Sequence, residues 1–155
     1  PGPPPQLPAE IQRGGVTVGE GKARLSSGLP PAQRTGRAGE DYTAGWLRRQ
    51  GYEILARNWR CPWGEMDIVA AKGGTVAFVE VKSRRPGSMT SPLEAVDAAK
   101  RRRLVKTAMA WLQQTRCALQ PRMDVAAVTV EEREGRELIC AFEYYEGAFE
   151  GGSHG

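Results

Sequence analysis

The segment from Gly64 to Arg84, GEMDIVAAKGGTVAFVEVKSR, constrains the fold more than any other part of the sequence. Two apolar runs flank Gly73 and Gly74, and a Gly-Gly pair between two strand patterns predicts a β-hairpin. Both predicted strands carry charged residues in the middle of the run, where a buried strand has no structural use for them. These charged residues are therefore the first candidates for a functional site.

The alternation of side chains along a strand indicates which of these charged side chains can lie close together. Residues two positions apart share a face, so Glu80 and Lys82 project together while Val79 points to the opposite face, where it can pack on a helix. In the first strand, Asp67 shares a side with Glu65. Pairing of the two strands can bring Asp67 beside Glu80.

The combination of Asp67, Glu80 and Lys82 suits metal-assisted hydrolysis. Two adjacent carboxylates repel each other, and a divalent cation removes that repulsion. Mg²⁺ (or Mn²⁺) typically uses one or two carboxylates together with waters and phosphate oxygens. A neighbouring lysine can hold the attacking water or stabilise charge on the phosphate. The alternative is that Glu80 and Lys82 form a solvated pair on an edge strand and that Asp67 is a surface residue.

The N-terminal part of the domain predicts a helix from about Arg37 to Gln50. Its apolar face contains Ala38, Tyr42 and Trp46, and Gly51 ends it. A strand over residues 52–60 follows and leads through a turn into the hairpin.

A second helix is predicted over residues 91–115. Ser91 is a fitting N-cap, Pro92 suits the first helical position, and Glu94 completes a capping box. Further strands are expected over residues 122–130 and 137–145.

This element order predicts one α/β (α+β) domain. The order of helix, three strands, helix and two strands favours a single mixed sheet flanked by helices, over residues 35–150. Residues 1–34 are rich in Pro and Gly and are expected to form a disordered arm, and residues 151–155 a flexible tail.

Composition excludes several classes of function. No run approaches the 18 apolar residues typical of a membrane span, and the N-terminal residues lack the apolar core of a secretory signal, so we expect a cytoplasmic protein without a membrane partner. His154 is the only histidine, which argues against histidine-based catalysis. Cys61, Cys117 and Cys140 have no zinc-site spacing and are expected to be reduced thiols.

The positive charge of the chain points weakly to an anionic partner. The net charge is +4, from 22 basic and 18 acidic residues. The run KRRR at 100–103 lies on a predicted helix, where residues three apart share a face, so this flank can hold a phosphate backbone; the alternative is a solvated polar face. Trp59 and Trp63 flank the turn before Glu65, where they either stack on unpaired bases or pack against the protein.

The charged constellation also resembles a known superfamily. An acidic residue in one strand, Glu-x-Lys in the next and a Glu in a preceding helix resemble the PD-(D/E)xK nucleases. The fuller run GEDYTAGWLRRQGYEILARNWRCPWGEMDIVAAKGGTVAFVEVKSR, with EAVDAAKRRRL, RMDVAAV and GAF after it, resembles the bacterial YraN-like family over residues 36–149. The resemblance implies a restriction-endonuclease-like fold, similar to that of archaeal Holliday junction resolvases.

The resemblance also implies roles for individual residues. Asp67 and Glu80 would be the metal-binding carboxylates, Lys82 the catalytic lysine, and the backbone carbonyl of Val81 a further metal contact. Glu40 matches the helical Glu that such nucleases direct toward the site, although a Glu early in a helix also interacts favourably with the helix dipole.

One further residue matches the family signature, and one departs from the superfamily pattern. Glu65 matches the acidic residue of the Gly-Glu-x-Asp signature and is a candidate either to support the metal ligands or to bind a second metal ion. Met66 stands where the superfamily often has a Pro.

The activity implied is a Mg²⁺- (or Mn²⁺-) dependent endonuclease that hydrolyses DNA phosphodiester bonds, with branched or flapped DNA as the expected substrate. The resemblance leaves a homodimer open, but no feature of the sequence requires one. A non-catalytic nucleic-acid-binding or protein-interaction module is the alternative, and RNA remains open as a substrate. The residues expected to contact nucleic acid are Arg84, Arg85, Lys100, Arg101, Arg103 and Lys106.

Overall fold

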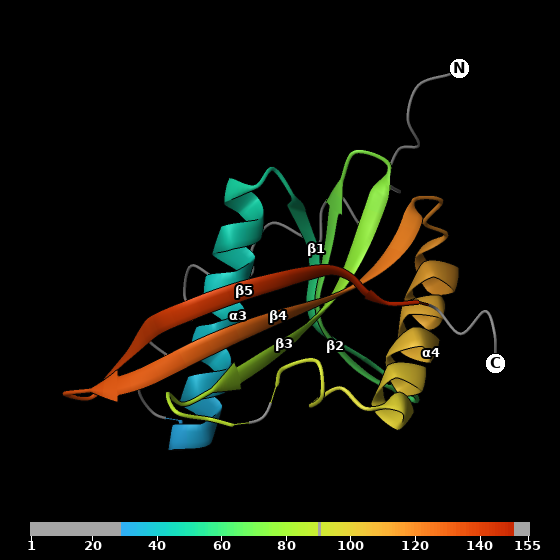
Figure 1. Ribbon diagram of the computed structural model, residues 1–155. Coiled ribbons are helices and arrows are strands. Elements are labelled where there is room, and N and C mark those ends of the chain that lie inside the picture. Colours follow the sequence, from blue (N-terminus) through green and yellow to red (C-terminus); the bar gives the residue numbers. More distant parts are fainter. Residues whose placement is uncertain (1–28, 90, 151–155) are drawn as a thin grey trace.

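The computed structural model describes residues 29–89 and 91–150 (Figure 1). Its elements are α3 (Pro31–Arg49), β1 (Glu53–Cys61), β2 (Gly64–Lys72), β3 (Thr75–Arg84), α4 (Ala98–Thr115), β4 (Gln120–Arg133) and β5 (Arg136–Phe149). The order of helix, three strands, helix and two strands is the predicted one. The predicted tail, 151–155, and residues 1–28 of the predicted arm lie outside the described residues, whereas residues 31–34 of that arm belong to α3.

The five strands form one mixed sheet in the order β1-β2-β3-β4-β5. β1, β2 and β3 are antiparallel neighbours, β3 and β4 are parallel, and β4 and β5 are antiparallel. Parallel strands need a long crossover, which α4 supplies between β3 and β4. This is the predicted α+β domain, and β3 is its central strand.

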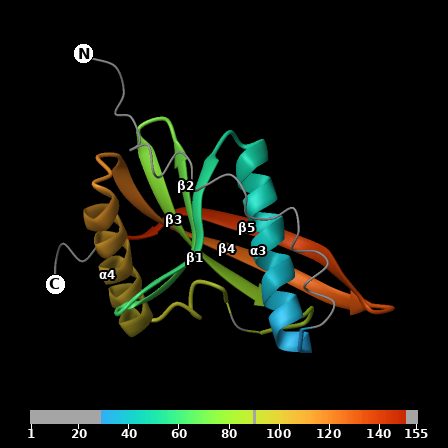
Figure 2. The same ribbon diagram turned by 180° about the vertical axis from the view of Figure 1, so that it is seen from behind.

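The two helices cover opposite faces of the sheet, as Figures 1 and 2 show from the two sides. On the α4 face, Trp111 packs edge-on against Phe78, with ring centroids 5.6 Å apart. On the α3 face, Leu47 belongs to a second cluster with Val79 and Ala77. Because β3 is covered on both faces, any charged residue in its middle lies inside the protein.

Helix α3 begins earlier and buries a different face than the sequence predicted. It starts at Pro31, with Pro30 as N-cap, rather than at Arg37, and proline at the first position is compatible with a helix start. Its buried residues are Thr35, Gly39, Thr43, Ala44 and Leu47. These residues are mostly small, which lets the helix approach the sheet closely.

The predicted apolar face of α3 packs elsewhere. Trp46 lies 4.7 Å from Tyr144 and 5.1 Å from Phe142 between ring centroids, so it packs against β5 at the flank of the helix. Tyr42 contacts Phe142 edge-on at 5.0 Å. The aromatic residues therefore extend the core sideways, over the last strand.

Helix α4 begins at Ala98, and the predicted start after Ser91 is wrong. The Asp97 side chain accepts a hydrogen bond from the Lys100 backbone N–H at 2.9 Å and caps the helix there. The preceding residues form turns, and Val96, 1% exposed, anchors them in the core. This later start puts Lys100 in the first turn of α4.

Two further features of the described residues concern membrane-spanning helices and the cysteines. No helix among the described residues is long and apolar enough to cross a membrane. All three cysteines lie in the described part and are free thiols: Cys61 and Cys117 are half-buried, and Cys140 is exposed.

Candidate metal centre and its surroundings

Asp67 and Glu80 face each other across the β2–β3 pair. The register pairs Ile68 with Val79, so the next step along both strands brings Asp67 opposite Glu80. The Val81 backbone N–H donates a hydrogen bond to Asp67 Oδ2 at 2.8 Å. Glu80 is only 5% exposed, and β3 is central in the sheet. The alternative of a solvated edge pair is therefore wrong.

The electrostatics of this pair are unfavourable for two negative charges. Burial, and next the charge of Glu80, raise the pKa of Asp67 from 3.8 to about 9, while the hydrogen bond from Val81 opposes the rise. Glu40 adds a smaller contribution in the same direction. With no cation bound, Asp67 therefore keeps its proton at neutral pH.

Two lysines contact Glu80 from different elements. Lys82 Nζ lies 3.4 Å from Glu80 Oε2, and Lys100 Nζ, from the first turn of α4, lies 2.8 Å from the same oxygen. Burial opposes the charge of Lys100, but its contacts with Glu80 outweigh burial and raise its pKa. The sequence placed Lys100 among the phosphate contacts, whereas its nearest partner in the structure is a carboxylate of the candidate site.

A cavity of about 230 Å³ opens beside the carboxylate pair. It lies between α4 and the tip of the β1–β2 hairpin, and its lining residues are Trp63, Gly64, Glu65, Asp67, Glu80, Lys100, Arg103, Leu104 and Thr107. Gly64 has φ +148 and a Cβ there would lie 3.4 Å from Thr107 Oγ1, so glycine lets the hairpin tip rest against α4. Lys82 does not line this cavity and contacts Glu80 beside it.

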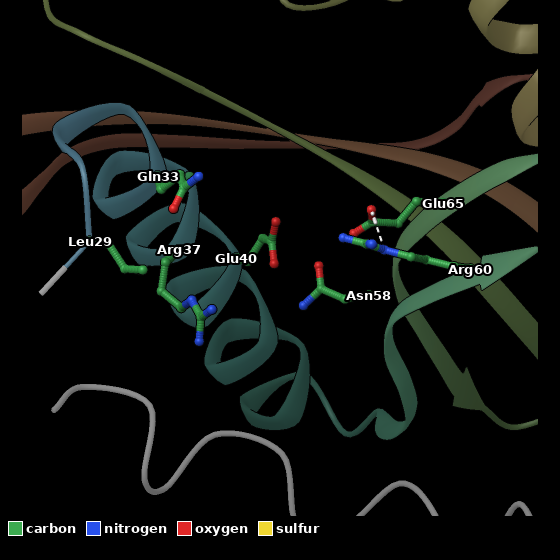
Figure 3. Close-up of a pocket in the computed structure, with 8 residues that line it drawn as sticks. Leu29, Gln33, Arg37, Glu40, Asn58, Arg60 and Glu65 are labelled. Carbon is green, nitrogen blue, oxygen red and sulfur yellow. Dashed lines mark hydrogen bonds and ion pairs between the residues drawn. The ribbon is translucent and has the colours of Figure 1, made fainter. Parts of the chain in front are cut away.

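A second, larger cavity of about 530 Å³ lies on the α3 side of the hairpin (Figure 3). Its lining residues are Leu29, Gln33, Gly36, Arg37, Glu40, Asn58, Arg60 and Glu65. Figure 3 shows the Glu40 carboxylate pointing from α3 across this cavity toward Asn58 and the hairpin. Glu65 lines both cavities and bonds Arg60 at 3.1 Å, so the two cavities adjoin at Glu65.

Glu40 is held by polar partners on β1. Burial raises its pKa, while a hydrogen bond from Asn58 and the charge of Arg57 oppose the rise, and the charge of Glu65 adds to it. Glu40 Oε1 lies 3.9 Å from Arg57 Nη2. Glu40 does not line the smaller cavity, but its charge reaches Asp67, so the helical carboxylate belongs to the same electrostatic cluster.

Asn58 is a site residue that the sequence analysis missed. It adopts a left-handed backbone conformation, φ +51, in the middle of β1 and lines the larger cavity. Asparagine is depleted in strands and is one of the few non-glycine residues that tolerate positive φ. The asparagine within the predicted strand over residues 52–60 was therefore the sequence feature that could have indicated this residue.

The six predicted nucleic-acid contacts divide into two groups. Lys100 and Arg103 line the smaller cavity, and the Lys106 ammonium lies 4.9 Å from the centroid of the Trp63 ring at its rim. All three come from one side of α4, at the spacing of three residues that the sequence predicted. The structure therefore brings these three basic residues together beside the smaller cavity.

The other three arginines make contacts away from the cavity. Arg101 donates to the carbonyls of Val96 and Leu93 and lies over the Phe149 ring. Arg85 pairs with Glu137 at 3.3 Å, near the distal end of β3. The charge of Arg84 acts on Tyr145. Their roles as nucleic-acid contacts stay predictions.

The donor set of the site fits a hard divalent cation. Within residues 29–89 and 91–150, no three Asp, Glu, His or Cys side chains gather closely enough to enclose a metal ion by themselves. Asp67 and Glu80 instead offer a pair of carboxylates beside an open cavity, and Mg²⁺ needs no more than this from the protein when waters and phosphate oxygens complete its shell. The position of the Val81 carbonyl in that shell stays a prediction.

Comparison with known proteins places this site in a family. The model of the family described as "Uncharacterised protein family UPF0102" matches residues 39–128, which include Glu40, Asp67, Glu80, Lys82 and Lys100. The chain belongs to the UPF0102 family. This confirms the resemblance to the YraN-like proteins.

Curated UPF0102 proteins match the chain over most of their length. One from Syntrophotalea carbinolica is 50% identical over 116 residues, covering 74% of this chain and 90% of the relative. One from a Synechococcus strain is 44% identical, covering 76% and 91%, and one from Pseudomonas aeruginosa is 47% identical, covering 65% and 81%.

Proposed function

We propose that this UPF0102 protein is a metal-dependent nuclease that hydrolyses DNA phosphodiester bonds, with Mg²⁺ or Mn²⁺ as cofactor. One observation carries the proposal: a carboxylate pair, the buried Glu80 and the half-buried Asp67, lies beside an open cavity with the ammonium groups of Lys82 and Lys100 on Glu80. Burial of two adjacent carboxylates is costly, and such sites are enriched at functional centres.

Asp67 and Glu80 would hold the cation through their carboxylate oxygens. A divalent cation there supplies positive charge for a phosphate oxygen and lowers the pKa of a water molecule. Binding of the cation favours the ionised form of Asp67, because an opposite charge nearby outweighs the repulsion from Glu80. The hydrogen bond from Val81 N–H fixes the orientation of the Asp67 carboxylate.

The lysines and the basic face of α4 complete the proposed site. The Lys82 side chain is 29% exposed, so its ammonium can reach a water or a phosphate oxygen while remaining close to Glu80. Arg103 and Lys100 both line the cavity, which gives the phosphate backbone two cationic partners without any reading of base sequence.

Cleavage of a panel of single-stranded, duplex, flapped and four-way DNA, with Mg²⁺ or Mn²⁺, tests the proposal. The wild type is expected to cleave at least one substrate, and Asp67→Asn and Lys82→Met to lower the rate by roughly 10²–10³-fold. Glu131→Gln, on an exposed carboxylate, and Lys72→Met, on the outer end of β2, are matched controls that should retain the wild-type rate. Unchanged cleavage by Asp67→Asn would refute the site assignment.

A specific observation favours a second candidate, a binding module without turnover. Lys82 and Lys100 already place two positive charges on Glu80, and a protonated Asp67 adds no negative charge, so this cluster needs no metal to offset its carboxylates. In that case the variant Asp67→Asn would bind DNA as the wild type does, and no divalent cation would change the binding.

A further inference from the structure

We propose that Trp63 is a stacking platform for an unpaired nucleobase, so that the bond to be cleaved lies beside unpaired nucleotides. This rests on the proposed function, because it takes the neighbouring cavity as the place of the scissile phosphate. It goes further by naming the chemical class of the substrate: a nucleic acid with at least one unstacked base at the site.

The first observation is the exposure of Trp63. It occupies the turn between β1 and β2 and is 52% exposed, whereas Trp111 is 2% exposed and packs in the core. Trp59, on the other side of the same turn, packs against the α4-side core, and Trp46 packs against Tyr144. Three of the four tryptophans thus have a packing role, and Trp63 leaves about half of its surface to solvent.

The second observation is the fixed position of the indole. The Lys106 ammonium lies 4.9 Å from the ring centroid, a cation–π contact, and Gly64 rests against Thr107 of α4. Figures 1 and 2 both show the tip of the β1–β2 hairpin lying beside the N-terminal half of α4. A ring held between two elements loses little conformational freedom when a ligand stacks on it.

The third observation is what surrounds the ring. Trp63 lines the same cavity as Asp67 and Glu80, and Lys100 and Arg103 line it from α4. Lys106 continues this row of cations to the rim. An aromatic ring beside a row of cations matches the two chemical parts of a nucleotide, the base and the phosphate.

Base pairing decides which nucleic acid can use this platform. In a duplex, neighbouring bases cover both faces of each internal base, whereas an unpaired base can leave the stack and place one face on an aromatic side chain. Stacking is sequence-tolerant because every base has a π face. Trp63 therefore selects for unpaired nucleotides rather than for a sequence.

Equilibrium binding of fluorescently labelled DNA, measured by anisotropy in EDTA, tests the inference. Trp63→Ala is expected to weaken binding of single-stranded DNA by about 10- to 100-fold and to leave duplex binding within about 2-fold of wild type. Trp63→Phe should restore most of the single-strand affinity, whereas Trp63→Leu, apolar without an aromatic ring, should not. Because Trp63 is half-exposed and a cation–π contact such as that with Lys106 is weak at an exposed site, these variants should stay folded, with melting temperatures within a few degrees of the wild type.

Three outcomes would overturn the inference: unchanged single-strand affinity of Trp63→Ala, an equal loss for duplex and single strand, or full restoration by Trp63→Leu. A matched single-stranded RNA forms the second arm, and a Trp63-dependent affinity for either polymer supports an unpaired base as ligand. Binding in EDTA needs neither metal nor turnover, so its result is independent of cleavage. Metal-dependent cleavage with Trp63-independent binding would refute this inference alone, and Trp63-dependent binding without any cleavage would refute the nuclease proposal alone.

Discussion

Asp67 is a carboxylic acid held among groups that disfavour its charge. Burial and the charge of Glu80, which faces it across the strand pair, raise its pKa, Glu40 adds to the negative field, and the hydrogen bond from the Val81 N–H opposes the rise. In the absence of a cation, the folded state therefore prefers the protonated acid. The same arrangement makes a divalent cation an effective partner, because it reverses the sign of the local field.

The pKa of Asp67 has a consequence for stability that can be measured without metal. The folded-state value is about 9 and the ordinary value is 3.8, so between these pH values the folded state binds more protons than the unfolded state. The free energy of unfolding therefore falls as pH rises through this window. An asparagine at this position carries no titrating group.

We expect Asp67→Asn to be more stable than the wild type in EDTA, by on the order of 1–2 kcal/mol at pH 8, and the difference to shrink toward pH 4. Thermal unfolding followed by circular dichroism across this pH range measures it, as a difference of about 2–4 °C in Tm per kcal/mol. Glu53→Gln, on an exposed carboxylate at the start of β1, should show no such trend. A pH-independent difference for Asp67→Asn would contradict the assigned environment.

Asn58 combines a strained backbone with a hydrogen bond to Glu40. Replacing it by Gly removes the hydrogen bond but keeps a residue suited to φ +51, whereas Ala removes the bond and strains the backbone. We expect Asn58→Ala to be about 1 kcal/mol less stable than Asn58→Gly, which is the reverse of the usual order of these residues in a strand. Urea denaturation of both variants measures this, and equal or reversed stabilities would remove strain as the reason for Asn at this position.

At the scale of elements, the strands were more predictable than the helices. Period-two alternation and the Gly73–Gly74 turn are local signals, and β2 and β3 match them. The start of α4 was misplaced because two capping signals compete within a few residues, and burial of Val96 favours the later cap at Asp97. The buried face of α3 was missed because small residues, not large apolar ones, contact the sheet.

The close approach of α3 to β3 depends on Gly39. A Cβ at this position would lie 1.9 Å from Ser83 Oγ and 3.2 Å from Ser83 Cβ. Rotation about χ1 can move the hydroxyl, but the Ser83 Cβ is fixed by the backbone and stays too close. The next residue on the helix is Glu40, so this contact also sets the distance of Glu40 from the sheet. Ser83 Oγ is buried, and within residues 29–89 and 91–150 it has no hydrogen-bond partner.

We expect Gly39→Ala to lower stability by about 1–3 kcal/mol, the usual cost of overpacking, despite the higher helix propensity of alanine. Combining it with Ser83→Gly should restore part of the loss, because the colliding atoms are then absent. Gly36→Ala, on the same helix with open space at the Cβ position, is the matched control and should be neutral or stabilising. Chemical denaturation checks all three, and a loss for Gly36→Ala equal to that for Gly39→Ala would contradict the packing argument.

At the scale of the whole molecule, the site joins elements that are distant in sequence. Asp67, Glu80 and Lys82 belong to one hairpin, so local alternation could predict their proximity. Lys100 reaches Glu80 only because the crossover helix lies over this end of the sheet, and such tertiary placement leaves no local pattern in the sequence. Asn58 likewise can form its hydrogen bond with Glu40 only because α3 lies near β1 in the fold.

The UPF0102 match includes most of the elements of the fold. The matched range of the UPF0102 family covers α3 from Gly39 onward, β1, β2, β3, α4 and most of β4. It therefore contains each element that supplies a group to the candidate centre. We propose that these elements together are arranged to hold a divalent cation between Asp67 and Glu80.

Titration of the protein with Mn²⁺, followed by the electron paramagnetic resonance signal of the free ion, tests that claim most directly. The wild type should remove free Mn²⁺ from solution, Mg²⁺ should compete for the same site, and binding should strengthen as pH rises because Asp67 must lose its proton. Asp67→Asn and Glu80→Gln should each weaken binding by about 10-fold or more, with Glu131→Gln as the unaffected control. Binding of Mn²⁺ that is equal in the wild type, Asp67→Asn and Glu80→Gln, or absent from all three, would contradict the account.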